Sequence, residues 1–296
     1  DRLIVRTDCD VAALVTQPDR PVGRKQVLTP PAIKTVAEER GVAVLQPEKI
    51  KTELDQLAAL NADFFVVMAY GQLLPQSVID CPKSACLNLH GSVLPRHRGA
   101  SPIQAAIVAG DEESGVTVMH VVKALDAGDV VHAVRTPIAA DETGGSLHER
   151  LAEIAATAID EAMDQFVVGT ANRTPQDPER VTYLGKLTRA DGGMDWTRSA
   201  VELERMVRAY HPWPGTTTTL KTGDRTLRLK IFPPVEVVTA ATGSAGAIAA
   251  IDDALLITCG DGKALRITQL QPDGKRRMSS QEFLRGFSAD DARVML

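Results

Sequence analysis

Short apolar runs alternate with segments of helical spacing along roughly the first half of the chain. The runs at residues 10–18, 42–45 and 63–70 are mostly or almost wholly apolar, as is typical of strands buried on both faces of a parallel sheet. Residues 31–41 and 53–60 repeat apolar side chains at helical spacing. This βαβαβ order predicts an α/β domain with a Rossmann-like, mostly parallel sheet and helices on both of its faces.

The pattern of the first domain continues as far as residue 168. Residues 116–120 alternate in a strand, and residues 130–138 predict another. The turn between them, rich in Asp and Gly, is too short to hold a crossover helix, so the second of these strands is expected to be antiparallel and at the edge of the sheet. Residues 146–168 then repeat apolar side chains at helical spacing, which predicts one long helix that closes the domain.

The start of the chain does not fit this pattern. A doubly wound sheet normally opens with a central strand and a glycine turn, but residues 1–10 contain no glycine. The first strand of the sheet is therefore expected to be missing or degenerate. We favour the interpretation that an amino-terminal segment is missing.

Short strands separated by Gly and Asp turns dominate the C-terminal third and predict a second, smaller, OB-like β-barrel domain. These strands are expected at residues 227–232, 235–238, 247–251, 255–259 and 265–270. Residues 201–207 have helical spacing and precede the barrel. Residues 170–188 are polar and contain prolines, which predicts a linker. The predicted domains are therefore residues 1–169 and residues 189–296.

Composition limits the class of protein. A chain of 296 residues is long enough for two domains, each with its own core. No apolar run approaches the roughly 20 residues that cross a bilayer, and no signal-peptide pattern opens the chain, so no membrane partner is expected. The cysteines are scattered, without a CxxC pair or a neighbouring Cys/His group. This spacing fits reduced thiols in a cytoplasmic protein and provides no tetrahedral metal site.

The net charge of −5 is unevenly distributed. Residues 1–188 carry a net charge of −7, whereas residues 189–296 carry +2. The C-terminal part is therefore the better candidate for binding an anion, although a difference of this size is also ordinary surface variation.

Asn88 and His90 form the most informative polar pair. They lie two residues apart in a strand-like segment, so both side chains point to the same side, and the chain breaks into a loop directly after them. Active sites of open α/β sheets form at such strand ends. In acyl or formyl transfer to an amine, an Asn amide and a protonated imidazole can stabilise negative charge on the carbonyl oxygen, and a carboxylate can hold the imidazolium.

The carboxylate is expected from the turn at residues 125–129, which reads LDAGD. Asp126 is the better placed to point inward, whereas Asp129 is suited to capping the turn. The residues alone leave a second interpretation open, in which Asn88 caps its strand and His90 is a hydrogen-bonded histidine of the core.

Other chemistries have less support in the sequence. There is no GxSxG element to present a nucleophile. The spacing of His90, His97 and His120 matches no zinc pattern. Neither GxGxxG nor GxxxxGK[ST] occurs, so dinucleotide or ATP use has no direct support.

Two motifs carry a resemblance to a known family. Residues 88–104, which read NLHGSVLPRHRGASPIQ, and the LDAGD turn resemble the signature of the 10-formyltetrahydrofolate-dependent formyltransferases. The match extends along nearly the whole chain, to residues 16–21, 46–49, 69–71, 181–183, 208–214 and 270–275. Within this family the chain is most similar to members that formylate methionyl-tRNA for translation initiation.

The resemblance implies a cytoplasmic, monomeric one-carbon transferase with the formyltransferase fold, whose partners are 10-formyltetrahydrofolate and initiator methionyl-tRNA and which needs no metal. It implies a catalytic trio of Asn88, His90 and Asp126. The segment that lines the folate site would be Ser92, Val93, Leu94 and Pro95, with the backbone at Tyr70, Gly71 and Leu74 beside the pteridine.

The resemblance also implies tRNA contacts from both predicted domains. Arg24 and Lys25 match a basic loop that approaches the acceptor end, and Lys186 and Arg276 are candidates for phosphate contacts in and after the linker.

Two alternatives stay open at the level of sequence. The first is a formyltransferase that acts on a small amine or a sugar nucleotide, but such an enzyme does not need a linker followed by a slightly basic barrel. The second is a non-catalytic RNA-binding module on a decayed formyltransferase fold, which the unusual start of the chain suggests.

Overall fold

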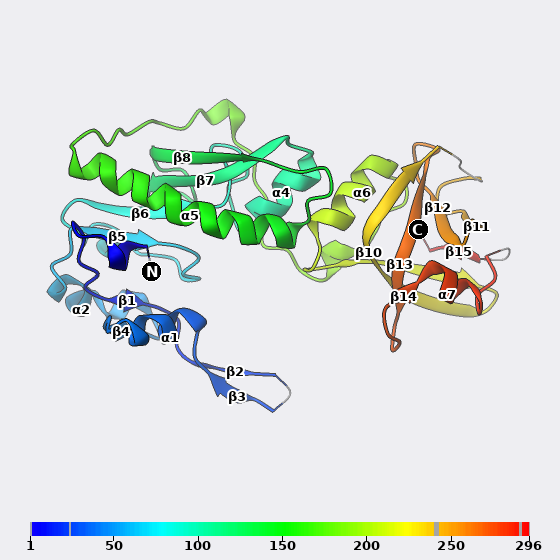
Figure 1. The fold of residues 1–296 in the computed structure, drawn as a ribbon, viewed down its shortest axis with the longest axis horizontal. Helices are drawn as coiled ribbons and strands as arrows, with labels where there is room; N and C mark the ends of the chain where they lie inside the picture. The colour runs from blue at the N-terminus through cyan, green and yellow to red at the C-terminus, as the bar shows by residue number, and fades with distance from the viewer. Residues whose placement is uncertain (1, 24, 240–242, 290–291, 296) are drawn as a thin grey trace. The chain divides into compact units, whose positions relative to one another are not determined.

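The computed structural model describes residues 2–23, 25–239, 243–289 and 292–295 (Figure 1). The chain forms two compact units. Unit 1 comprises residues 1–98, 115–135 and 152–182, and unit 2 comprises residues 99–114, 136–151 and 183–296. The predicted boundaries at residues 169 and 189 stay a prediction. In the described part of the chain, no helix combines the length and the apolar character that crossing a membrane requires.

The first described strand is β1, Leu14–Val15, which pairs in parallel with β4, Val44–Leu45. Helix α1, Ala32–Glu39, connects them, as the helical spacing predicts. Residues Leu3–Val5 form a 3-10 helix, so no strand precedes Leu14 among the described residues. The pair β1–β4 is accordingly a sheet of its own, because no strand joins it to the main sheet.

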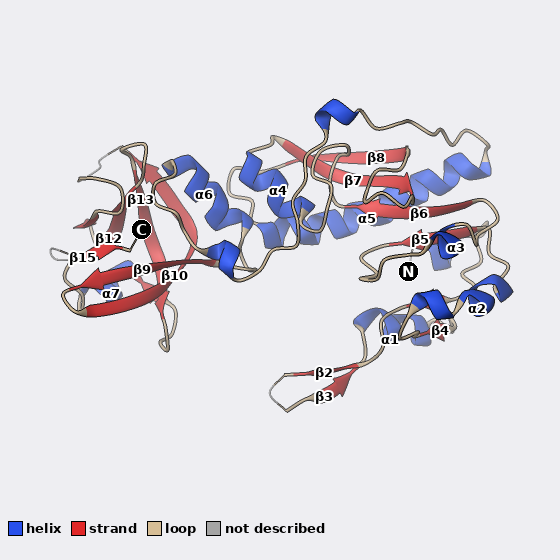
Figure 2. Cartoon of the chain, turned by 180° about the vertical axis from the view of Figure 1, so that it is seen from behind, coloured by secondary structure: helices blue, strands red, loops and turns tan. Residues whose placement is uncertain are grey.

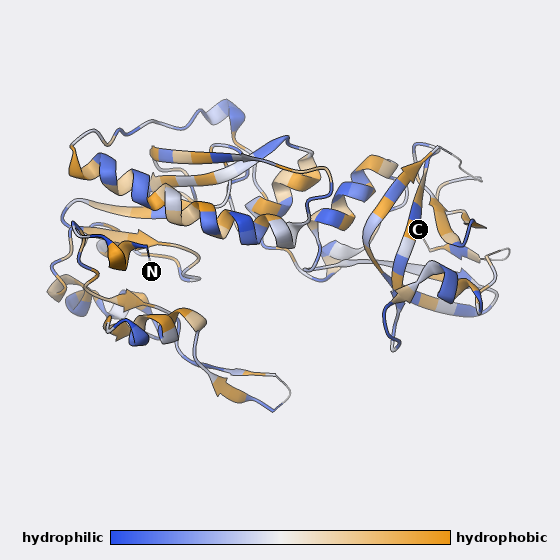
Figure 3. Cartoon of the chain, in the orientation of Figure 1, coloured by the Kyte–Doolittle hydropathy of each residue, from blue (hydrophilic) through white to orange (hydrophobic). Residues whose placement is uncertain are grey.

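A hairpin of β2, Arg20–Val22, and β3, Val27–Thr29, follows β1 and was not predicted. All six of its strand residues are exposed, and Figures 1 and 2 show it projecting beyond α1. Figure 3 shows that β3 is nonetheless hydrophobic. Leu28, for instance, is 65% exposed.

The main sheet of the α/β part has four strands in the order β5-β6-β7-β8. They are β5, Phe64–Val67, β6, Ala85–His90, β7, Glu113–His120, and β8, Val130–Pro137. Strand β6 pairs in parallel with β5 and antiparallel with β7, so the sheet is mixed around its most buried strand. Strand β8 lies at the edge, as predicted.

Helices lie between and beside these strands. They are η2, Ile50–Thr52, α2, Leu54–Ala59, α3, Gln76–Ile79, α4, Pro102–Ala109, and α5, Gly144–Val167. Helix α5 matches the predicted long helix. Near its end the Phe166 ring lies 4.8 Å from the Phe64 ring of β5, which joins the helix to the sheet.

Strand β6 is the structural centre of this part. Five of its six residues are buried, and Leu87 is completely inaccessible. Burial raises the pKa of the Cys86 thiol to about 12, so this cysteine is an inert core residue. The burial of the strand fixes its orientation and therefore fixes the face on which its polar side chains emerge.

The predicted linker is bound to unit 1 along its first half. Thr174 forms an isolated bridge with Val130 of β8, and a 3-10 helix follows at Pro178–Arg180. The Arg98 N–H donates to the carbonyl oxygen of Thr182 at 2.9 Å. Residues 174–182 are therefore held to unit 1 by hydrogen bonds, although most of them are exposed, and do not form a free spacer.

The C-terminal part is a nearly closed antiparallel barrel, as predicted, with strands in the order β11-β12-β13-β10-β9-β15 (Figure 2). An isolated bridge between Ala247 and Arg293 connects its two ends. Its elements are η4, Ala190–Gly192, α6, Ala200–Ala209, β9, Thr216–Thr222, β10, Arg225–Val238, β11, Ile248–Ile251, β12, Ala254–Thr258, β13, Ala264–Pro272, β14, Met278–Ser279, α7, Ser280–Leu284, and β15, Ala292–Val294.

Two of the predicted strands are in fact one. Residues 227–232 and 235–238 both belong to β10, whose register against β13 shifts between Phe232 and Val235. Pro233 and Pro234 occupy that bulge, because a proline has no N–H for the ladder. Strand β9 was not predicted, since its run of threonines shows no apolar alternation although threonine favours strands.

Candidate active site

His90 and Asp126 come together in the structure as the sequence predicts. Asn88 and His90 lie two residues apart on β6, so their side chains emerge on one face of the sheet. Asp126 comes from the loop between β7 and β8. Its Oδ2 is 3.8 Å from His90 Nδ1, and the His90 and Asp126 side chains are only 6% and 11% exposed. The imidazole and the carboxylate therefore face each other and are largely shielded from solvent.

The other ring nitrogen of His90 is held by the loop that follows β6. His90 Nε2 is 2.8 Å from the carbonyl oxygen of His97. A carbonyl oxygen only accepts, so Nε2 carries a hydrogen and donates it. In the neutral ring the lone pair is therefore on Nδ1, which faces Asp126.

Asn88 is half-buried and is paired with Met119 in the register of β6 against β7. Its side-chain amide has no hydrogen-bond partner among the residues that the structure describes. A neutral amide donor of this kind can stabilise negative charge that develops on a substrate oxygen.

The loop at residues 91–99 is fixed from within and from β7. The Ser92 hydroxyl donates to the carbonyl oxygen of Arg96 at 2.7 Å. Thr117 Oγ1 donates to the carbonyl oxygen of Ser92 at 2.7 Å and accepts from the Leu94 N–H at 3.1 Å. Ser92 is 1% exposed, so its hydroxyl supports the loop. Val93 and Pro95 are half-buried, and Leu94 is buried.

Gly99 closes this loop at a position that only glycine can fill. Its φ is 101°, a conformation that L side chains rarely adopt. A Cβ there would also lie 2.4 Å from the carbonyl oxygen of Leu184. The backbone conformation at residue 99 and the close approach of the Leu184 backbone thus explain why the RHRGASP motif has a glycine at this position.

The other predicted folate residues, Tyr70, Gly71 and Leu74, lie in the loop after β5. The Tyr70 ring and Leu74 pack against the cluster formed by Ile50, Leu57 and Val78. Burial raises the pKa of the Tyr70 hydroxyl. Gln17 donates to the carbonyl oxygen of Tyr70 at 2.9 Å, which fixes the backbone at the point where the folate is predicted to lie.

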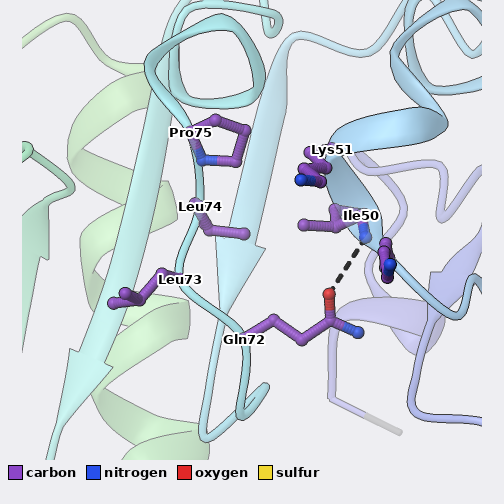
Figure 4. Close-up of a pocket in the computed structure, with 7 residues that line it drawn as sticks. Ile50, Lys51, Gln72, Leu73, Leu74 and Pro75 are labelled. Carbon is purple, nitrogen blue, oxygen red and sulfur yellow. Dashed lines mark hydrogen bonds between the residues drawn. The ribbon is translucent and has the colours of Figure 1, made fainter.

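A hollow of about 360 Å³ opens behind this loop (Figure 4). Its lining is Lys49, Ile50, Lys51, Gln72, Leu73, Leu74 and Pro75. Figure 4 shows Leu74 and Ile50 pointing toward each other across it. The Gln72 side chain accepts from the Ile50 N–H at 3.0 Å and connects the two walls. Of the predicted site residues, Leu74 alone lines this hollow.

The predicted tRNA contacts lie on exposed segments. Lys25 is exposed in the turn of the β2–β3 hairpin, whereas Arg24 lies outside the described residues. Lys186 is exposed in the second half of the linker. The Arg276 side chain is 72% exposed and forms an ion pair with Glu282.

Sequence reasoning missed two kinds of residue. Thr117, Gln176 and Thr182 bind the loops that carry the candidate site. Thr117 left a signal as a polar residue in an apolar strand, and Thr182 lies within residues 181–183, which carry part of the family resemblance, but none of these contacts was predicted. The pairing of two arginines with aromatic rings was also not predicted. Arg277 lies 4.3 Å from the centre of the Phe232 ring, and Arg189 lies 5.8 Å from that of Trp213.

Two family models match the chain. The model described as formyl transferase matches residues 5–163, and the model of the formyl transferase C-terminal domain matches residues 186–288. This chain belongs to the formyl transferase family. The resemblance carried by residues 88–104 is thereby confirmed, together with the two-part fold that it implied.

Curated relatives of this formyl transferase match over most of its length. A methionyl-tRNA formyltransferase of Akkermansia muciniphila is 48% identical over 281 residues, which cover 94% of this chain and 89% of the relative. A methionyl-tRNA formyltransferase of Bacillus subtilis is 36% identical over 297 residues, which cover 99% of this chain and 92% of the relative.

Solved structures share the fold of this formyl transferase at lower identity. HypX from Aquifex aeolicus, in complex with tetrahydrofolic acid, matches with a TM-score of 0.60 and 21% identity over 93% of this chain, although the match spans 47% of that chain. An N-formyltransferase from Helicobacter canadensis, bound to folinic acid and dTDP-3-aminofucose, matches with a TM-score of 0.63 and 16% identity over 85% of this chain and 86% of its own.

Proposed function

We propose that this chain transfers a formyl group from 10-formyltetrahydrofolate to the amino group of methionine on initiator methionyl-tRNA. The observation that carries the proposal is the placement of the Asn88 amide, which has no hydrogen-bond partner among the described residues, beside the His90–Asp126 pair. The scaffold that places them has methionyl-tRNA formyltransferases as relatives over most of their length. The reaction belongs to translation initiation, so it takes place in the cytoplasm, and we expect the chain to act as a monomer.

Bound folate supplies the formyl group. The chain holds it, in this proposal, with Val93, Leu94 and Pro95 after β6 and with the backbone at Tyr70 and Gly71. An apolar wall beside fixed backbone polar groups suits a flat heteroaromatic molecule. The same wall excludes water from the reacting carbon.

Asn88 and His90 stabilise the charge of the reaction. As the amine attacks the formyl carbon, negative charge develops on the formyl oxygen, and the Asn88 amide donates to it. Because the hydrogen on His90 Nε2 is held by His97, a charged His90 donates from Nδ1. Donors that are already in place need no reorganisation during the step.

Asp126 accepts the proton that the attacking amine releases in this step. Its carboxylate faces His90 Nδ1 at 3.8 Å, so it stabilises the imidazolium and accepts, directly or through water, the proton that the attacking amine loses. When the tetrahedral intermediate collapses, the bond between the formyl carbon and the folate nitrogen breaks, and tetrahydrofolate leaves with a proton on that nitrogen, which balances the proton that the amine lost. No residue forms a covalent bond to the formyl group in this mechanism.

The acceptor is proposed to be tRNA on the strength of surfaces outside the active site. The hairpin turn that holds Lys25 projects into solvent, and Arg276 is mostly exposed on the barrel. Arginine beside an exposed aromatic ring, as for Arg189 and the 50% exposed Trp213, suits a nucleic acid, since guanidinium groups contact phosphate and rings stack on bases.

The alternatives are less well supported. Two sugar N-formyltransferase structures that match this chain are 15% and 16% identical to it, whereas the methionyl-tRNA formyltransferase of Akkermansia muciniphila is 48% identical. A decayed module would not need to keep an amide, an imidazole and a carboxylate in working arrangement.

A formylation assay tests the proposal. Purified chain is incubated with 10-formyltetrahydrofolate and charged initiator tRNA, in parallel with a small amine or an amino sugar nucleotide as the acceptor. We expect formyl-methionyl-tRNA and no formylated small amine. Formylation of the small amine alone would replace tRNA as the acceptor, and tRNA binding without folate-dependent turnover would support the RNA-binding module.

A further inference from the structure

Gln176, in the predicted linker, joins two loops of the active site. Its Nε2 donates to the carbonyl oxygens of Asp126 at 2.9 Å and Gly128 at 2.8 Å. Its Oε1 accepts from Arg98 Nε at 3.0 Å and from Arg98 Nη2 at 2.7 Å. The amide therefore uses both hydrogens on one loop and both lone pairs on the other.

Each of these two loops places one group beside a ring nitrogen of His90. One loop ends in His97 and Arg98, and the His97 carbonyl holds His90 Nε2 at 2.8 Å. The other carries Asp126, whose carboxylate lies 3.8 Å from His90 Nδ1. Gln176 touches neither nitrogen, but it fixes the distance between the groups that do.

The segment around Gln176 binds the first loop a second time. Thr182 Oγ1 accepts from the His97 N–H at 2.8 Å, and the Thr182 carbonyl accepts from the Arg98 N–H at 2.9 Å. His97, whose carbonyl oxygen accepts from His90, is thus itself hydrogen-bonded to Thr182.

The second loop needs an external partner because its backbone is strained. Asp126 has a φ of 50°, a left-handed conformation that costs free energy for a residue with a Cβ. A hydrogen bond to the carbonyl of that same residue favours this conformation over its alternatives. The direction of the Asp126 carboxylate follows from it.

We propose that Gln176 is a positioning residue, which sets the geometry of Asp126 against His90 by holding the two active-site loops at a fixed separation. The expected effect on kcat rests on the proposed function. The expected effect on the placement of Asp126 against His90 rests only on the contacts of Gln176. A side chain of the linker thereby acts on the rate of the formyl transfer without contacting either substrate.

Kinetics of three variants test the proposal. Gln176→Ala removes the whole connection, and Gln176→Glu keeps its shape and its acceptor for Arg98 but loses the donors to Asp126 and Gly128. We expect both to lower kcat by about tenfold or more with the KM of each substrate nearly unchanged, because a small displacement of a reacting group is enough for such a loss. The matched control is Glu179→Gln, on an exposed residue of the same segment, which should keep the parent kcat.

A double-mutant cycle separates positioning from general damage to the fold. If Gln176 acts through Asp126, Gln176→Ala should lower kcat by less than about twofold in an Asp126→Asn background, where there is no carboxylate left to position. A full tenfold loss in that background, or a Gln176→Glu variant with parent kcat, would overturn the proposal.

NMR of the chain with ¹⁵N-labelled histidine gives a readout that does not depend on turnover. Gln176→Ala should shift the His90 ring-nitrogen signals, whereas Glu179→Gln should leave them in place. Unchanged signals in Gln176→Ala would contradict the positioning role even if activity fell. Shifted signals in a chain without formylation activity would instead contradict the proposed function and leave the positioning role standing.

Discussion

Single side chains in the site differ in what they offer to the reaction. The Asn88 amide is neutral and has no partner in the described part of the chain, whereas His90 is held at Nε2 by the His97 carbonyl and faces Asp126 with Nδ1. The two residues are therefore expected to respond differently to substitution, although they are neighbours on one strand.

Asn88→Ala should lower kcat by on the order of a hundredfold, because a donor aimed at the developing negative charge is lost. The KM for either substrate should change little, since the interaction strengthens only in the transition state. Steady-state formylation measures both constants. Asn172→Ala, on an exposed residue of the linker, is the control. A variant at Asn88 with raised KM and parent kcat would contradict an electrostatic role.

The choice between the two aspartates of the LDAGD turn can be tested directly. Asp126→Asn should lower kcat by on the order of a hundredfold, because His90 loses the group that stabilises its charge. Asp129→Asn should keep most of the parent rate, since its carboxylate is 3.3 Å from Arg173 Nε and its carbonyl oxygen accepts from the His120 N–H. Equal losses in the two variants would mean that the turn acts as a structural unit.

At the scale of elements, neighbouring strands support the chemistry of β6. Thr117 of β7 is fully buried, and its hydroxyl both donates to Ser92 and accepts from Leu94. A single side chain therefore connects the strand that precedes the Asp126 loop to the loop that follows His90.

Thr117→Val keeps the shape of the side chain and removes both hydrogen bonds. It should lower the free energy of unfolding by about 1–3 kcal/mol, since a buried N–H and a buried carbonyl lose their partners. The KM for folate should rise, because the loop that is proposed to bind it loses its support. Urea unfolding and formylation kinetics measure the two effects. Thr226→Val, on an exposed residue of β10, should change neither.

Helix α6 of the second unit begins with a capping box that makes its stability depend on pH. The Ser199 hydroxyl and the Arg198 guanidinium lower the pKa of Glu202 from 4.5 to about 2. The folded state thus keeps this charge at lower pH than the unfolded state does, so the contribution is present above pH 4.5 and is lost as the pH falls toward 2.

Glu202→Gln should accordingly lower the free energy of unfolding by about 1 kcal/mol near neutral pH and by less in acid. Urea unfolding at about pH 7 and about pH 3 gives the comparison. Glu149→Gln, on an exposed residue of α5, is the control. A difference between parent and Glu202→Gln that grows as the pH falls would have the wrong sign and would contradict the cap.

At the scale of the whole molecule, the proposed reaction needs both units. The proposed catalytic residues lie in unit 1, while the candidates for phosphate contacts in and after the linker, Lys186 and Arg276, lie in unit 2. Affinity for tRNA and the rate of the chemical step should therefore be separable by mutation.

Arg276→Glu should raise the KM for tRNA several-fold at physiological salt and leave the KM for folate unchanged. The dependence of tRNA affinity on salt should also become shallower by about one contact, because one fewer counterion is released on binding. Filter binding across a salt series measures the slope. Lys263→Glu reverses an exposed charge elsewhere on the barrel and serves as the control. Equal effects of the two substitutions would indicate a nonspecific response to net charge.

The sequence by itself determined the α/β class, the second barrel and the face on which Asn88 and His90 emerge, because strand and helix periods are local and β6 is almost entirely apolar around them. It also places two candidate carboxylates, Asp126 and Asp129, in the LDAGD turn. Local spacing carries no information about which nitrogen of His90 is held, since the His97 carbonyl reaches it only after the loop has folded back.

Tertiary structure decided the rest. It set the Asp126 carboxylate 3.8 Å from His90 Nδ1, merged two predicted strands into β10, and bound residues that read as a linker to the loops of the candidate site. Gln176 has no periodic neighbours and lies about fifty residues from Asp126, so its role depends on contacts that form only when distant segments pack together.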